Sequence, residues 1–107
     1  MTIETGEWIE AVSVADIPAG GLARAEINGV CLAFYNLEGS FHATGEYCTH
    51  AKASLVDGFL EGDVIECPLH QARFHILTGE VRGGPTRKPL KVYPVREENG
   101  TLYVQIT

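Results

Sequence analysis

Hydrophobic and polar residues alternate along short segments of this chain, and turn-forming residues separate one segment from the next. In residues 101–106, Leu102, Val104 and Ile106 occupy every second position between more polar neighbours. Alternation with a period of two predicts a strand with one buried face. Hydrophobic repeats at helical spacing do not persist over any long stretch of the sequence. The pattern therefore favours an all-β fold.

Twelve glycines and five prolines punctuate the chain, which is typical of short strands linked by turns. Asn28-Gly29 and Asn99-Gly100 each separate two apolar segments, and Asn-Gly is the strongest short-range hairpin signal. The pattern predicts strands over residues 8–12, 22–27, 30–35, 41–44, 64–66, 73–76, 91–97 and 101–106. It predicts turns over residues 13–21, 36–40 and 77–80, and a Gly- and Pro-rich loop over residues 81–89. We expect a small antiparallel β-sandwich or barrel.

Length and charge narrow the class of protein. A chain of 107 residues predicts a single domain over residues 1–107. A net charge of −6 argues against nucleic-acid binding, which needs clustered Lys and Arg, and is compatible with a basic protein partner. The first twelve residues show no signal peptide and no membrane-spanning run, so we expect no membrane association. Three cysteines fit a disulfide framework poorly, which predicts reduced thiols or metal ligands and a cytoplasmic location.

Two short segments near the middle of the chain each hold one cysteine and one histidine. Cys48 and His50 form Cys-x-His, and Cys67 and His70 form Cys-x-x-His with Pro68 between them. Structural zinc sites usually pair two cysteines in one segment and two histidines in another. One cysteine and one histidine per loop instead suits a two-iron cluster whose irons have unlike ligands. Zinc, or four unrelated residues, are the alternatives.

At these residues the chain resembles a known family. The segments CTH and CPLH match the fingerprint of Rieske [2Fe–2S] proteins. The stretch of residues 48–80 is similar to the ferredoxin components of bacterial aromatic-ring-hydroxylating dioxygenase systems of the naphthalene and biphenyl type. The resemblance implies one Rieske [2Fe–2S] cluster in a cluster-binding subdomain at about residues 45–85. It also likens the Gly83-Gly84-Pro85 segment to the proline loop that covers the cluster in this family.

The resemblance implies a role for each ligand. Cys48 and Cys67 are expected to bind the inner iron, and His50 and His70 the outer iron nearer solvent. Respiratory Rieske proteins, which are similar, carry two further bridged cysteines and direct a serine and a tyrosine hydroxyl at the cluster. The matching positions here are Ala53, Leu69, Ala72 and Phe74. With fewer donors, the cluster is expected to have a potential low in the Rieske range, about −150 mV.

The function that the resemblance implies is that of an electron carrier and not of an enzyme. The expected partners are a flavin-containing, NADH-dependent ferredoxin reductase and a terminal oxygenase of aromatic hydrocarbon catabolism. An oxygenase needs an open iron site and a substrate pocket, and a fold that uses the whole chain leaves room for neither. The alternatives are an accessory module of a larger reductase and a zinc-binding interaction module.

Several other residues are open to a structural reading. Cys31 is expected to pack in the core, and Trp8 to be a packing anchor and not an electron-path residue. His42 and His75 are expected to be ordinary surface or cross-strand histidines, with a role in docking as the alternative. Lys52 is expected to be a solvated charge. A group of acidic residues is expected to form a solvated face that also steers a basic partner: Glu61, Asp63, Glu97 and Glu98.

Overall fold

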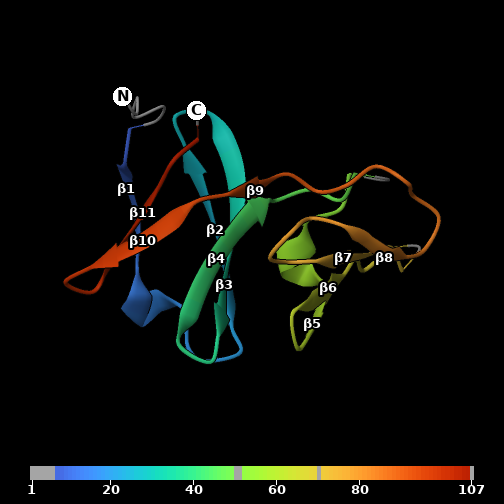
Figure 1. The fold of residues 1–107 in the computed structure, drawn as a ribbon, viewed down its shortest axis with the longest axis horizontal. Helices are drawn as coiled ribbons and strands as arrows, with labels where there is room; N and C mark the ends of the chain where they lie inside the picture. Colours follow the sequence, from blue (N-terminus) through green and yellow to red (C-terminus); the bar gives the residue numbers. More distant parts are fainter. Residues whose placement is uncertain (1–6, 50–51, 70, 107) are drawn as a thin grey trace, which may run out of the picture.

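The chain folds into three antiparallel β-sheets in a computed structural model that describes residues 7–49, 52–69 and 71–106 (Figure 1). The first sheet has the order β1-β11-β10, formed by Ile9–Ser13, Thr101–Val104 and Val95–Glu98. The second has the order β2-β3-β4-β9, formed by Leu22–Ile27, Val30–Leu37, Ser40–Gly45 and Val92–Tyr93. The third has the order β5-β6-β7-β8, formed by Phe59–Glu61, Val64–Glu66, Arg73–His75 and Val81–Gly83.

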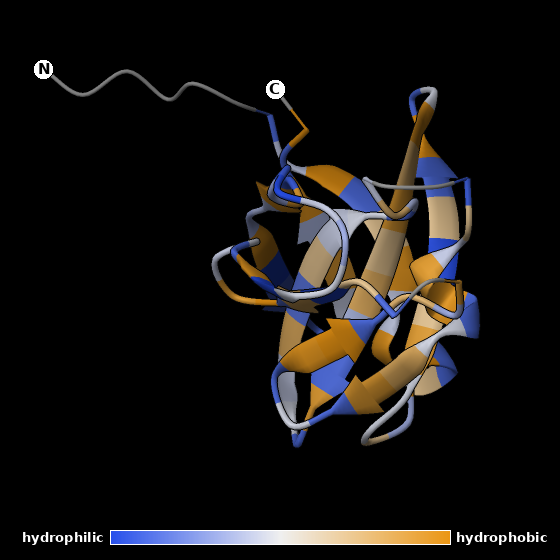
Figure 2. Ribbon diagram, turned by 90° about the vertical axis from the view of Figure 1, so that its right-hand side faces the viewer, coloured by the Kyte–Doolittle hydropathy of each residue, from blue (hydrophilic) through white to orange (hydrophobic). Residues whose placement is uncertain are grey.

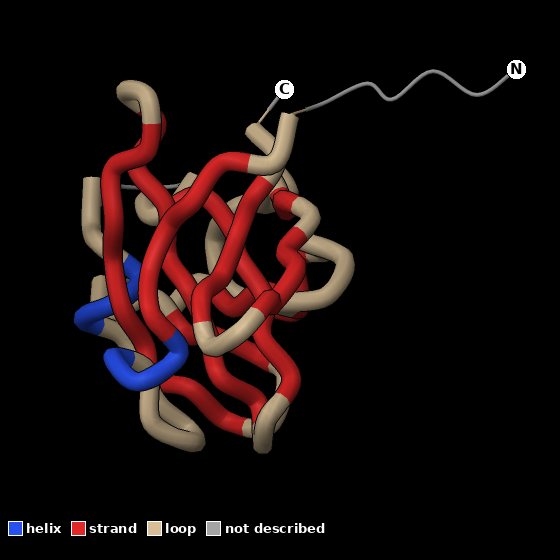
Figure 3. The backbone as a smooth tube through the Cα atoms, turned by 90° about the vertical axis from the view of Figure 1, so that its left-hand side faces the viewer, coloured by secondary structure: helices blue, strands red, loops and turns tan. Residues whose placement is uncertain are grey.

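The all-β prediction is confirmed. In the described part of the chain, the helical elements are two short 3₁₀ turns, η1 (Val14–Asp16) and η2 (Leu55–Asp57), which Figure 3 shows in blue among the strands. Ser13 and Ser54 cap these turns, because their hydroxyls accept hydrogen bonds from the second residue beyond. None of the helices in the described residues is long and apolar enough to cross a membrane.

Strand β3 joins two hydrophobic cores because both of its faces are buried. Leu32 and Phe34 pack against the first sheet in a cluster that we call the base core. Its buried residues are Ile17, Leu32, Phe34, Ala43, Leu102 and Val104. Ala33 and Tyr35 point the other way, into a cluster that we call the cysteine core. This second cluster contains Ala33, Tyr35, Cys48, Ala53, Leu55, Ile65, Cys67, Ala72, Phe74, Ile76 and Leu90.

The turn signals in the sequence determine the hairpins. Asn28-Gly29 and Asn99-Gly100 have positive φ at both positions and close two-residue loops between paired strands. This is the type I′ geometry, whose twist matches that of the flanking strands. Glu38-Gly39 forms a third loop of the same kind, inside the predicted turn over residues 36–40. In Figure 2, hydrophobic and hydrophilic residues alternate along some of the strands, whereas β3 is apolar on both faces.

The structure corrects two assignments in the third sheet. The loop expected over residues 81–89 begins instead with a strand, because residues 81–83 form β8 and pair with β7. Residues 59–61 form β5, a strand that the sequence pattern does not predict, and they pair with β6. Residues 59–61 begin with two adjacent apolar residues, and residues 81–83 lead into a Gly- and Pro-rich stretch, so neither shows the alternation that predicts a strand.

The predicted strand over residues 91–97 is in fact two strands in different sheets. Pro94 separates β9, which pairs with β4, from β10, which pairs with β11. Proline has no N–H to donate to a ladder, while its carbonyl here accepts a hydrogen bond from the Gln105 N–H at 3.1 Å. Because of this break, residues 92–98 contribute β9 to the second sheet and β10 to the first.

Residues 46–91 join β4 to β9 and contain the whole third sheet, which lies at one end of the long axis in Figure 1. The two ends of this segment meet, because the Gly45 N–H donates to the Lys91 carbonyl at 3.0 Å. The division of the single domain at about residues 45–85 stays a prediction.

Candidate metal centre

The two cysteine segments form loops that are closed in the same way. The Cys48 N–H donates to the Ala53 carbonyl at 2.9 Å, and the Cys67 N–H donates to the Ala72 carbonyl at 2.7 Å. In each loop the accepting residue is an alanine five positions after the cysteine. The shared pattern is visible in the sequence as CTHAKA and CPLHQA, and the structure shows what it does. Each cysteine is therefore fixed by its own main chain.

The loops bring the two thiols together. Cys48 is 6% exposed and Cys67 is fully buried. Neither is part of a disulfide, and their side chains lie within hydrogen-bonding reach of each other. Burial raises the pKa of the Cys67 thiol, and the neighbouring Cys48 raises it further. Two adjacent buried thiolates need a cation to offset their charge, so this pair suits a metal ion.

A main-chain donor points at one of these sulfurs. The Leu69 N–H lies 3.4 Å from Cys67 Sγ and opposes the rise in the pKa of this thiol. Pro68, which has no N–H, stands between the sulfur and this donor in the sequence. Hydrogen bonds to a ligating sulfur tune the potential of an iron–sulfur cluster. The donor set therefore fits the inner iron of a [2Fe–2S] cluster.

Two of the four predicted ligands, His50 and His70, lie outside the described residues. Their assignment to the outer iron stays a proposal, supported by their positions two residues after Cys48 and three residues after Cys67.

A third loop closes over both cysteine loops. Gly84 has φ +91°, and a Cβ atom placed on it would lie 2.5 Å from the Cα of Ala72. At the first cysteine loop, the Thr49 hydroxyl donates to the Lys88 carbonyl at 2.8 Å and lies 3.1 Å from the Thr86 hydroxyl. The segment after β8 therefore contacts the second cysteine loop at Gly84 and the first at Thr49. No sequence signal indicates the Thr49 contacts, because their partners lie 37 and 39 residues away.

The buried carboxylate of Glu46 holds the start of the first cysteine loop in place. Glu46 is 4% exposed, accepts a hydrogen bond from the Ser54 hydroxyl at 2.7 Å and forms an ion pair with Arg24 Nη1 at 3.3 Å. Its main-chain carbonyl accepts from the Leu55 N–H at 2.8 Å. Arg24 also reaches Asp57, at 3.6 Å. These contacts tie the entry of the loop, two residues before Cys48, to β2 and to the η2 turn.

The four positions that the resemblance singles out differ in burial. Ala53 is 8% exposed, and Ala72 and Phe74 are fully buried in the cysteine core. None of the three has a polar side-chain atom. Leu69 is half exposed. No side chain at these four positions can donate to a cluster.

The remaining predicted residues have structural contacts or face solvent. His42 faces Tyr35 across the β3–β4 pair and lies 2.9 Å from the Ser40 hydroxyl. His75 lies 3.0 Å from Asp63 and 3.2 Å from Thr78. Both therefore are cross-strand or surface histidines, as predicted. The charged residues expected in solvent are exposed: Lys52, Glu61, Asp63, Glu97 and Glu98.

Cys31 is less buried than predicted, whereas Trp8 packs against Arg96. Cys31 is only half-buried, because it precedes the fully buried part of β3. Trp8 is also half-buried, and the Arg96 guanidinium lies 4.9 Å from its ring centroid. The prediction of full core packing is wrong for Cys31.

Comparison with known families shows which family has this pair of cysteine loops. The family described as the Rieske [2Fe–2S] domain matches residues 7–94. The chain belongs to this family. Its cofactor is one Rieske-type [2Fe–2S] cluster.

Two ferredoxin components match almost the whole chain. The ferredoxin component of the naphthalene 1,2-dioxygenase/salicylate 5-hydroxylase systems of Ralstonia sp is 47% identical, and the match covers 89% of this chain and 91% of that relative. The ferredoxin component of the naphthalene 1,2-dioxygenase system of Pseudomonas putida is 43% identical, with 96% and 99% covered.

A solved structure shares the fold. It is a chain from the complex of reduced oxygenase and oxidised ferredoxin in carbazole 1,9a-dioxygenase, with a TM-score of 0.85, 38% identity and 92% of each chain covered.

Proposed function

We infer that this chain is the ferredoxin of a multicomponent aromatic-ring dioxygenase system and passes single electrons to the terminal oxygenase. The observation that carries the inference is the similarity to dioxygenase ferredoxins, which extends over nearly the full length of both chains. A chain of similar fold occurs in a complex with an oxygenase. The protein is an electron carrier and not itself an enzyme.

We propose a flavin-dependent, NADH-oxidising ferredoxin reductase as the electron donor. The support is membership of such systems, in which a ferredoxin component stands between a reductant and an oxygenase. Because NADH is a cytoplasmic reductant, we also propose a cytoplasmic location.

The residues of the chain have distinct tasks in this role. The cluster, when bound, accepts and releases one electron at a time. We propose that Cys48 and Cys67 hold the inner iron and that His50 and His70 hold the outer iron. The cysteine core keeps water from the sulfurs, and the Leu69 N–H stabilises negative charge on Cys67 Sγ.

The cofactor is tested by metal and sulfide analysis together with visible and EPR spectra of the reduced protein. Equimolar iron and acid-labile sulfide support the proposal. Stoichiometric zinc without sulfide, in protein made with ample iron, would identify a zinc-binding interaction module instead.

Electron transfer is tested by stopped-flow mixing with the reductase and with the oxygenase. Leu69 is 50% exposed beside Cys67, and Pro85 is exposed in the loop that closes the site. We propose that both partners dock in turn on this tip. Leu69→Glu or Pro85→Glu should slow transfer with both proteins while the visible spectrum stays the same.

Leu77 provides a matched control, because it is also an exposed leucine, at 47%, but lies in the turn after β7. Leu77→Glu should leave both transfer rates near the wild-type values. A protein that the flavoprotein cannot reduce would be an accessory module and not a carrier.

A further inference from the structure

The charges of this acidic chain are divided very unevenly. Residues 47–56 and 81–91 contain five basic and no acidic residues, so together they carry a formal charge of +5. The rest of the chain contains three basic and fourteen acidic residues and carries −11. These two segments include the first cysteine loop and the loop that closes over it. The net charge of −6 therefore conceals a basic region at the candidate metal centre.

The basic residues also differ in whether they are neutralised. Four arginines form ion pairs with carboxylates: Arg24, Arg73, Arg82 and Arg96. The other four basic residues have no carboxylate within ion-pair distance among the residues that the structure describes. They are Lys52, which lies in the first cysteine loop, and three residues that we call the basic edge: Arg87, Lys88 and Lys91. All four are exposed.

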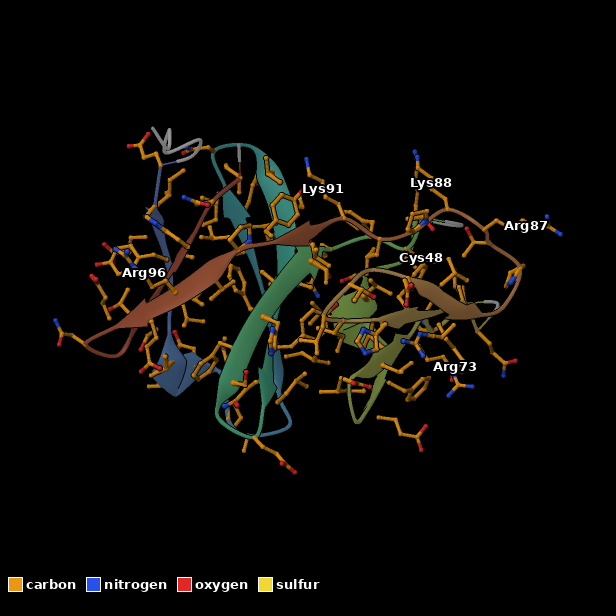
Figure 4. The ribbon with its side chains drawn as sticks, in the orientation of Figure 1. Cys48, Arg73, Arg87, Lys88, Lys91 and Arg96 are labelled. Atoms are coloured by element: carbon orange, nitrogen blue, oxygen red, sulfur yellow. The ribbon has the colours of Figure 1, made fainter. Side chains whose placement is uncertain are left out.

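The basic edge is attached directly to the first cysteine loop. The Lys88 carbonyl accepts a hydrogen bond from Thr49, which follows Cys48 in the chain. Figure 4 shows Lys88 beside Cys48, with Lys88 and Lys91 pointing off the same edge of the molecule and Arg87 at its end. The Lys91 ammonium lies 5.3 Å from the centroid of the Tyr93 ring, which helps to hold it in place.

Screening by salt determines whether a partner protein is attracted mainly by the basic edge or by the net charge of the whole chain. The molecule extends 39 × 32 × 23 Å. The Debye length is about 8 Å at 0.15 M ionic strength and about 30 Å at 0.01 M. At physiological salt, a protein docked at the tip is therefore screened from most of the distant carboxylates. The nearby unpaired cations then contribute more to the local potential than those distant carboxylates do.

We propose that the basic edge docks on a carboxylate-rich face of the terminal oxygenase. This inference rests on the proposed function and reverses the expectation, drawn from the net charge, of a basic partner. Charge complementarity at the rim of an interface mainly raises the association rate and orients the partners. Brief docking of this kind suits a carrier that must leave after each electron.

The test compares two charge reversals that change the net charge equally. Lys88→Glu alters the basic edge, and its main-chain bond to Thr49 does not depend on the side chain. Arg96→Glu alters β10, which Figure 4 shows at the opposite end of the molecule. The second-order rate constant for electron transfer to the oxygenase is measured by stopped flow between about 0.02 and 0.3 M salt.

We expect the wild-type rate constant to fall as salt rises, and Lys88→Glu to lower it about fivefold at low salt. Arg96→Glu should change it less than about twofold. Equal effects of the two variants, or a wild-type rate that rises with salt, would overturn the proposal. An effect on reduction by the reductase alone would also overturn it, because the edge would then serve the other partner.

The experiment also distinguishes failure of the docking proposal from failure of the proposed function. Normal transfer that is unaffected by Lys88→Glu refutes the docking proposal and leaves the proposed function intact, whereas wild-type protein that transfers no electron to the oxygenase refutes both. Sedimentation velocity provides a second measurement. Self-association at low salt that Lys88→Glu abolishes would assign the edge to a second copy of this chain and overturn the proposal.

Discussion

Substitution of Gly84 tests how tightly the closing loop holds the second cysteine loop. Gly84 has φ +91°, a conformation that residues with a Cβ rarely adopt. A Cβ there would lie 2.5 Å from the Ala72 Cα and 2.8 Å from the Gln71 carbonyl oxygen. Carbon atoms normally approach to about 3.5–4.0 Å, so the two loops must separate by roughly 1 Å. Gly84→Ala should therefore open the cover above the cysteines.

Gly39 is a closely matched control, because its φ is +92° and nothing lies within 4 Å of the position that a Cβ would take. Gly39→Ala should cost about 1–2 kcal/mol, from backbone strain alone. Gly84→Ala adds forced overlap, which costs typically about 1–3 kcal/mol more. Guanidinium unfolding, followed by circular dichroism, measures the loss of stability. The rate at which the visible absorbance bleaches during incubation with a chelator measures exposure of the cluster.

We expect Gly84→Ala to bleach roughly tenfold faster than Gly39→Ala, since about 1.4 kcal/mol corresponds to a factor of ten. If both variants lost the same stability and bleached at the same rate, the closing loop would not be held by its contact with Ala72. The reasoning from the close approach of these loops would then be refuted.

Three further predictions concern the ligands, the potential and the pH dependence of stability. Cys48→Ser should abolish assembly of the cluster, whereas Cys31→Ser should keep the full iron and sulfide content, since Cys31 is half-buried in β3. The wild-type potential should lie near about −150 mV, and Ala72→Ser with Phe74→Tyr should raise it in a redox titration; a wild-type value above zero would contradict this. Burial lowers the pKa of His42 from its ordinary value of 6.5, so the unfolded state binds more protons and stability falls as the pH drops below about 6.5. His42→Gln should lose less unfolding free energy than wild type between about pH 7 and pH 5, and an equal loss would show that His42 is not the group responsible.

The sequence was most informative where structure is encoded locally. The Asn-Gly hairpins and the alternation around Leu102 and Val104 depend on neighbouring residues, and the structure places both as predicted. The cysteine pair was also predictable, because each cysteine lies in a short loop with a recognisable spacing. Pro94 is a local signal too, since a proline inside a predicted strand marks a break or an edge.

Contacts between distant segments could not be predicted. Thr49 and Lys88 are ordinary residues in ordinary loops, and only the folded chain brings them to 2.8 Å. In the sequence, Glu46 cannot be distinguished from the other acidic residues, although in the structure it is buried in contact with Arg24 and Ser54. The basic edge was hidden in the same way, because net charge reports a total and not a distribution.

The meeting of Gly45 and Lys91 has a consequence for the order of events during biogenesis. Their hydrogen bond and the adjoining β4–β9 pairs close a loop of about 45 residues, and such closure costs about 3 kcal/mol of chain entropy. The pairs between β4 and β9 involve none of the proposed ligands, so we expect the second sheet to bear this cost without a metal. Iron and sulfide then have only to join two short loops that are already confined near each other. The apoprotein should therefore be a loading-competent precursor, in which insertion of the cluster is a local event and not a folding event.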